Sequence, residues 1–141
     1  KPDEVIRAVA DTGGYIGICC IPPFLGRTRD INAMLDHIEY AVKRFGAEHV
    51  AIGTDVAYTP TTSAAQSQKI PRRARTRARF EYFWPDGALG GENPRQETLE
   101  WSNWPLFTVG MVQRGLRDDD IRRILGGNVL RVARMALAEA A

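Results

Sequence analysis

The sequence predicts an α/β fold, because two short apolar runs stand on either side of an amphipathic helix. The runs are residues 15–21 (YIGICCI) and residues 49–55 (HVAIGTD), and the apolar centre of each is continuous. Continuous apolar runs are typical of strands that are buried on both faces of a parallel sheet. The order strand, helix, strand therefore predicts a right-handed βαβ unit with parallel strands.

Helices are predicted before, within and after this unit. The first begins at Pro2, with Asp3 and Glu4 in its first turn, and ends at residues 13–14, which are both glycine. The helix between the strands is expected to begin after the capping residue Asp30 and to end at Gly46. Its apolar positions follow the 3.6-residue period at Ile31, Met34, Leu35, Ile38, Val42 and Phe45.

The C-terminal part of the chain again has helical patterns. Helices are predicted for residues 106–114, 118–125 and 128–140. Gly115 separates the first two, and Gly126 with Gly127 precedes the last. Asn128 is expected to be the N-cap of that last helix.

Residues 56–103 are predicted to be a long loop or insertion after the second strand. They lack periodicity, are rich in threonine, serine, glycine and proline, and include the basic stretch 69–79. Loops of this length are uncommon and are often functional, so the position directly after a strand end suggests a lid. Trp84, Trp101 and Trp104 are expected to pack this loop onto the fold. The alternative is that one of them lines a pocket or a dimer contact.

Composition indicates one globular domain. The 141 residues are 44% hydrophobic, and the net charge of +2 does not demand a polyanionic partner. No apolar stretch approaches the roughly 18 residues that a membrane span needs. The chain begins at Lys1, which leaves a signal peptide open. Cys19 and Cys20 are adjacent in an apolar run, so we expect buried free thiols and a reducing, cytoplasmic location.

Three ordered pieces of the sequence carry a family resemblance. They are PDEVIRAVADTGG (2–14), HIEYAVKRFGAEHVAIGTD (37–55) and RGLRDDDIRRILGGNVLRV (114–132). Together they resemble the closing third of the membrane (renal-type) dipeptidase family of zinc metallopeptidases. The resemblance implies that residues 1–141 are the C-terminal fragment of one TIM-type (β/α)8 barrel domain. Residues 15–21 and 49–55 would be its last two parallel strands, followed by the C-terminal helices.

The same resemblance implies a chemistry and a site. Members of the family hydrolyse dipeptides with two zinc ions, whose ligands would all lie upstream of Lys1, so this chain is expected to supply no metal ligand and to be inactive alone. Asp55 matches the family aspartate that lies near the bridging water and the substrate amino group, and it is the predicted catalytic residue. Residues 56–58 and the pair Cys19 and Cys20 depart from the usual family pattern, which leaves the substrate range open.

Other interpretations accompany these predictions. Asp55 could cap a nearby turn, and His37 and His49 are interpreted as structural, since two histidines make a poor zinc site. The arginines of residues 69–79, followed by aromatic residues, superficially resemble a nucleic-acid-binding segment. An isolated basic run in a balanced chain instead favours a solvated or subunit-contacting loop and no nucleic acid. A family member that has lost hydrolysis and acts in binding or structure is the remaining alternative. A homodimer is left open.

Overall fold

A parallel two-stranded sheet lies at the centre of the computed structural model, which describes residues 1–26, 28–55, 62–69 and 97–139. Strand β1 (Ile16–Ile18) pairs with β2 (Val50–Ile52), with Ile16 opposite Val50. The pairing continues beyond the regular strands, because Gly53 N donates to Ile18 O at 3.0 Å and Cys20 N donates to Thr54 O at 3.0 Å. The predicted parallel pairing of the two apolar runs is confirmed.

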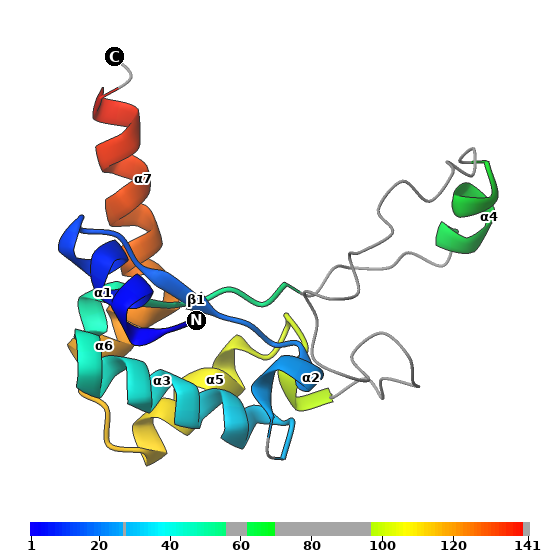
Figure 1. The fold of residues 1–141 in the computed structure, drawn as a ribbon. Coiled ribbons are helices and arrows are strands. Elements are labelled where there is room, and N and C mark those ends of the chain that lie inside the picture. The colour runs from blue at the N-terminus through cyan, green and yellow to red at the C-terminus, as the bar shows by residue number, and fades with distance from the viewer. Residues whose placement is uncertain (27, 56–61, 70–96, 140–141) are drawn as a thin grey trace.

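Helices surround this sheet and make the described chain a mixed α/β structure (Figure 1). The elements before and between the strands are α1 (Asp3–Asp11), α2 (Pro22–Leu25), α3 (Ile31–Phe45) and the 3-10 turn η1 (Ala47–His49). After β2 come α4 (Ser63–Gln68), η3 (Glu97–Leu99), α5 (Trp104–Gln113), α6 (Asp118–Arg122), the π-helical segment η4 (Arg123–Gly127) and α7 (Asn128–Glu139).

The core lies between the sheet and helices α3 and α5. Its largest fully buried apolar side chains come from the sheet, α3, η3, α5 and the segment before α7; they are Met34, Ile38, Val50, Leu99, Phe107, Met111 and Ile124. Burial of side chains of this size contributes roughly 1.5–3 kcal/mol each relative to exposure. The core therefore packs α3 against both strands and α5 against α3.

Helix α3 has the ends that its sequence predicts. The Asp30 carboxylate accepts hydrogen bonds from Asn32 N at 2.9 Å and Ala33 N at 3.3 Å, which satisfies two amides of the first turn. At the other end, Gly46 has φ 96°, a conformation that glycine adopts at low cost. The predicted cap and the predicted stop are both confirmed.

The predicted N-cap of the last helix is wrong. Asn128 has helical dihedral angles (φ −67°, ψ −40°), so it lies within a continuous helical run. The preceding glycines produce a kink rather than a separate turn, because only Gly126 leaves the helical conformation (φ 170°, ψ −19°). The side chain of Asn128 is 2% exposed and is directed toward β2 instead of its own helix.

Two short helices, α4 and η3, lie within residues 56–103, the stretch predicted as a long loop. Residues 70–96, with most of the basic stretch and Trp84, lie outside the described residues. Trp104 packs against the buried core, as predicted, and lies edge-on to Phe107 of its own helix with 5.8 Å between ring centroids. Trp101 is exposed, so the packing prediction is wrong for this residue. Across the described residues, no helix has the length and apolar character needed to cross a membrane.

Candidate active site

The predicted catalytic residue Asp55 lies just beyond the carboxyl end of β2. Its side chain is exposed, and its backbone has φ 52°, in the left-handed region. This conformation costs L-residues roughly 1–2 kcal/mol, although aspartate tolerates it better than most. Strained backbone of this kind is concentrated at functional sites, so the conformation itself supports a functional role for this end of the sheet.

The end of β1 lies beside Asp55. The hydrogen bond from Cys20 N to Thr54 O joins the segments that follow the two strands, one residue before Asp55. Cys20 is 1% exposed, and its thiol contacts Met34 Sδ at 3.6 Å. Burial raises the pKa of the Cys20 thiol to about 12, with a smaller contribution from Cys19, so Cys20 is unsuited to act as a nucleophile.

Both cysteines are free, as predicted, but the expected burial holds for Cys20 and is wrong for Cys19, which is partly exposed. The cytoplasmic location inferred from them stays a prediction. Because Cys20 is buried in its neutral form, the carboxylate of Asp55 is the better candidate for proton transfer at this end of the sheet.

The two histidines are separate from Asp55. His37 Nε2 hydrogen-bonds with Leu25 O at 2.9 Å, and His49 Nδ1 hydrogen-bonds with Gly14 O at 2.7 Å. His49 ends η1 immediately before β2 and is therefore at the opposite end of that strand from Asp55. These contacts are in keeping with the structural interpretation of both side chains.

Nor do the described residues gather a set of metal ligands. Within residues 1–26, 28–55, 62–69 and 97–139, no group of three or more histidine, cysteine, aspartate or glutamate side chains is placed to hold a metal ion. A zinc site needs at least three such protein ligands in close range. The described part of the chain therefore does not by itself provide the ligands that a zinc ion needs.

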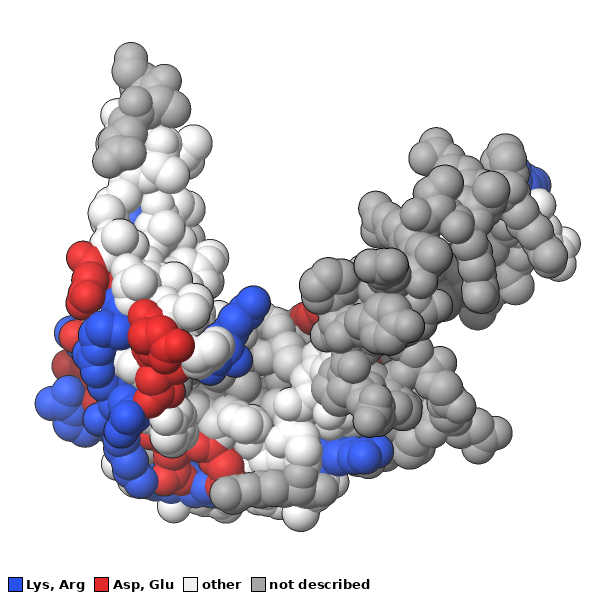
Figure 2. Space-filling model, viewed as in Figure 1, with Lys and Arg blue, Asp and Glu red and all other residues white. Residues whose placement is uncertain are grey.

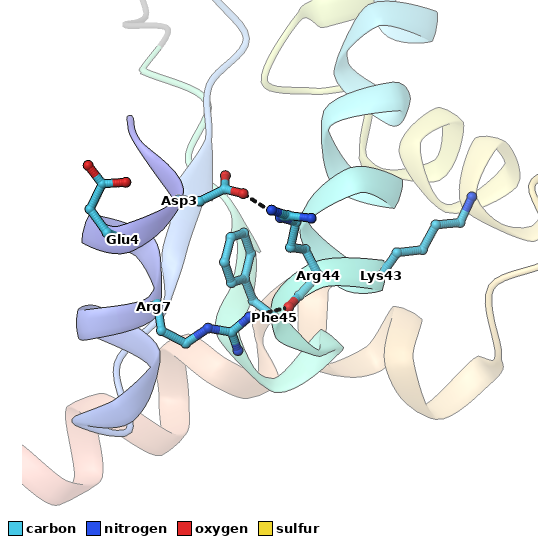
Figure 3. A pocket seen from close by; sticks show the side chains of 6 residues that line it. All are labelled: Asp3, Glu4, Arg7, Lys43, Arg44 and Phe45. Carbon is cyan, nitrogen blue, oxygen red and sulfur yellow. Dashed lines mark hydrogen bonds and ion pairs between the residues drawn. The ribbon is translucent and has the colours of Figure 1, made fainter.

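The hollow between α1 and the end of α3 is a second candidate binding site (Figure 3). It has a volume of about 560 Å³ and is lined by Asp3, Glu4, Arg7, Lys43, Arg44 and Phe45. Several of its charged groups are engaged in contacts within the protein. Arg44 forms an ion pair with Asp3, and Arg7 donates to Arg44 O at 2.7 Å while lying 4.9 Å from the centre of the Phe45 ring.

Asp3 also accepts a hydrogen bond from the Tyr40 hydroxyl at 2.8 Å, and this bond is the main reason why the pKa of Asp3 is lowered. We interpret this hollow as the polar junction between α1 and α3. A smaller hollow of about 370 Å³ is lined by Glu48, Arg123, Gly127, Asn128 and Arg131. Asp55 lines neither hollow.

Sequence reasoning missed two side chains of α7. Asn128 donates to Ala47 O and Val50 O, and Arg131 donates to Gly13 O and Glu48 O. The available signal was the pair of polar residues in the first turn of a largely apolar helix, directly after two glycines. That pattern gives no indication of which distant backbone groups the side chains bind.

These features define an α/β protein with an exposed aspartate, in a left-handed backbone conformation, just after the carboxyl end of a parallel strand. Residues 2–71, about half of the chain, match the family model described as membrane dipeptidase (peptidase family M19). The chain belongs to this family, which confirms the resemblance seen in the sequence.

Curated relatives agree with this assignment. Dipeptidase ataJ of Aspergillus terreus is 25% identical over 134 residues, which cover 92% of this chain and 25% of the relative. Dipeptidase verJ of Clonostachys rogersoniana is 25% identical over 133 residues, covering 94% of this chain and 26% of the relative. The chain thus spans about a quarter of the length of these relatives. No solved structure gives a significant match.

Proposed function

We propose that this chain is the C-terminal part of a dipeptidase in which Asp55 transfers a proton during hydrolysis of a dipeptide. The observation that carries the proposal is the position of Asp55, exposed and in a left-handed backbone conformation directly after the second of two parallel strands. Membership of the dipeptidase family supports the reaction type. In this proposal β1 and β2 are the last two strands of a (β/α)8 barrel.

The barrel placement gives the position a chemical meaning. Catalytic residues of (β/α)8 barrels lie at the carboxyl ends of the strands, where the loops that follow them form the substrate site. Asp55 is at that end, whereas His49, Asn128 and Arg131 are at the amino ends. An ionised carboxylate there is able to accept a proton from the attacking water and to donate it to the leaving amine.

The involvement of metal ions is an expectation from the family resemblance. The family resemblance implies two zinc ions, but the described residues offer no matching donor set. We propose that the ligands belong to the preceding part of the full-length protein. Asp55 is accordingly assigned only what its own carboxylate does, which is to hold or move a proton next to the substrate.

The test is Asp55→Asn in the full-length protein. Losing a positioned acid or base is expected to lower kcat by about 10²- to 10⁴-fold, equivalent to roughly 3–5 kcal/mol of barrier. Metal content and the melting temperature are expected to stay nearly unchanged, because asparagine is almost isosteric. The measurement is kcat on a simple L,L or L,D dipeptide, together with metal analysis.

A matched control is Asp11→Asn, which alters an exposed aspartate at the end of α1. This change is expected to leave kcat within about twofold of wild type, since exposed substitutions away from a site have small effects. If Asp55→Asn keeps more than about a third of the wild-type kcat, Asp55 is a structural residue and the assignment fails. A wild-type full-length protein with no dipeptidase activity would instead favour the inactive family member.

A further inference from the structure

Three side chains bind the backbone at the amino ends of both strands. His49, Asn128 and Arg131, which we call the strand latch, make hydrogen bonds to five carbonyl groups just before or at the start of β1 and β2. These carbonyls belong to Gly13, Gly14, Ala47, Glu48 and Val50. The latch therefore connects two chain segments and the first turn of α7.

Asn128 fixes the start of β2. Its amide nitrogen donates to Ala47 O and to Val50 O, each at 2.8 Å, and the residue is 2% exposed. Both amide hydrogens are therefore used on the chain that leads into the strand. Ala47 O also accepts a hydrogen bond from Val50 N, so loss of this side chain would take away one of the two donors to Ala47 O and the side-chain donor to Val50 O. Both carbonyls belong to buried residues, where a lost hydrogen bond is costly.

Arg131 joins the starts of both strands. Its Nη1 donates to Gly13 O at 2.6 Å, and its Nη2 donates to Glu48 O at 2.8 Å. The His49 Nδ1 contact with Gly14 O at 2.7 Å makes a second connection between the same two segments. Because a carbonyl only accepts, this ring nitrogen carries the hydrogen.

The position of the strand starts determines the position of Asp55. From Val50 the chain runs through the paired residues of β2 to Thr54, which accepts the bond from Cys20 N, and the next residue is Asp55. A strand advances about 3.3 Å per residue, so even part of a one-residue slip moves its end by more than an ångström. Misplacement of about 1 Å at a reacting group costs on the order of 10²-fold in rate.

We propose that Asn128 and Arg131 are positioning residues for Asp55. They hold β2 at one axial position relative to β1 and thereby place the carboxylate at the far end of the strand. This inference rests on the proposed catalytic role of Asp55. The alternative is that the latch stabilises the fold without any influence on the carboxylate.

A double-mutant cycle in the full-length protein separates the two roles. Asn128→Ala, Asp55→Asn and the double variant are compared by kcat and KM on one dipeptide, with rates normalised to the folded fraction measured by circular dichroism. A positioning role predicts that Asn128→Ala lowers kcat on the order of 10-fold in the wild-type background, with KM within about threefold. In the Asp55→Asn background the same change is expected to lower kcat less than about twofold, because the group that it positions is absent.

Arg134→Ala is the matched control, since Arg134 is an exposed arginine on the same helix. It is expected to leave kcat within about twofold in both backgrounds. Should Asn128→Ala fail to fold, Arg131→Lys is the milder variant, because it keeps the charge but cannot bind two carbonyls in the geometry of a guanidinium group. It is expected to show the same dependence on Asp55.

The outcomes are distinct. If Asp55→Asn impairs turnover while Asn128→Ala or Arg131→Lys lowers kcat by the same factor in both backgrounds, or not at all, the positioning inference is overturned and the catalytic role of Asp55 stands. If Asp55→Asn itself leaves kcat unchanged, the proposed function and the positioning inference both fail.

Discussion

Cys20 hydrogen-bonds to the residue before Asp55, and its burial keeps its thiol unreactive. Its thiol lies against the Met34 sulfur and is almost completely buried. Desolvation disfavours the thiolate, which raises the pKa of Cys20 from 9.0 to about 12. The neutral thiol is therefore the form that packs in the core, and the folded state loses stability as the pH rises above about 9, where the unfolded thiol ionises.

We expect Cys20 to resist alkylation in the folded protein. At pH 8 the raised pKa reduces the thiolate fraction by about 10³-fold relative to an ordinary cysteine, and burial hinders access further. Iodoacetamide labelling followed by peptide mass spectrometry measures the rate at this position. Labelling in urea is the control, where Cys20 should react like a free thiol. Comparable rates in the two conditions would contradict the burial of Cys20.

At the same scale, residues whose partners are close in sequence were predictable and those with distant partners were not. Asp30 binds amides two and three positions ahead, so its capping role was visible in the sequence. Asn128 has the same short polar side chain before a helical pattern, but its partners are 81 and 78 positions away. A local pattern contains no information about such contacts, and the N-cap prediction failed for that reason.

Helix α3 contacts both strands and several helices of the described chain. Its N-terminus is capped by Asp30, and Arg114, at the end of α5, forms ion pairs with Asp36 and Glu39 at 2.7 Å each. The hydrogen bond to the Asp36 carboxylate is the main cause of the raised pKa of Arg114. These contacts add directionality to the packing of α3 against α5.

Asp30→Ala is expected to destabilise the full-length protein by about 1 kcal/mol, the usual loss when an N-cap side chain is removed. The pKa of Asp30 is lowered, chiefly by the Thr28 hydroxyl and also by the capped amides. Its contribution is therefore present above the unfolded pKa near 4 and is lost as the pH falls through the lower folded value. Urea unfolding of both proteins at pH 7 and near pH 3 measures this difference.

The control for this measurement is Asp11→Ala, which removes an acid from the last residue of α1. An acid at a helix C-terminus is slightly unfavourable, so this variant is expected to be neutral or slightly more stable. A loss at pH 7 equal to that of Asp30→Ala, or an Asp30→Ala loss that does not shrink at low pH, would exclude the capping explanation.

The strands themselves were located correctly but are shorter than the apolar runs. Regular pairing covers Ile16–Ile18 and Val50–Ile52, and single hydrogen bonds at Gly53 and Cys20 continue it. The expected burial holds for β2, whose three residues are buried, but is wrong for β1, where Gly17 is exposed and both isoleucines are half-buried. Beyond the regular pairing of β1, Cys20 is buried. Two strands alone do not define a barrel. Assigning them as the seventh and eighth strands of a barrel therefore depends on the family resemblance.

Considered as a whole molecule, the described chain leaves much apolar and strand-edge surface uncovered. The sheet of the described residues consists of β1 and β2, so within these residues each strand has one edge that no other strand pairs with. Figure 2 shows basic and acidic side chains intermixed on the body of the molecule, while the face of α7 in this view is mostly uncharged, although the helix also carries Arg134 and Glu139. Leu130, Met135 and Leu137 are exposed on this helix.

We expect the isolated 141-residue chain to aggregate. Parallel sheets are normally covered on both faces, and open strand edges with exposed apolar side chains promote association. Size-exclusion chromatography and a thermal melt, with the full-length protein as the control, measure this behaviour. Purification of the isolated chain as a monomer with a sharp, cooperative melt would show that it is a self-contained fold.

The strand latch also determines when the sheet becomes secure during synthesis. Arg131 reaches back across 118 positions to Gly13 and across 83 to Glu48. At translation rates of about 5–20 residues per second, β2 would wait roughly 4 to 17 s before the arginine that fastens its start is made. A chain that terminates after Asp55 and before Asn128 contains both strands and the candidate carboxylate but no hydrogen bonds from α7. The pairing of the two strands thus depends on α7, a segment that is synthesised long after both strands, and we expect products that end before α7 to be more sensitive to proteases.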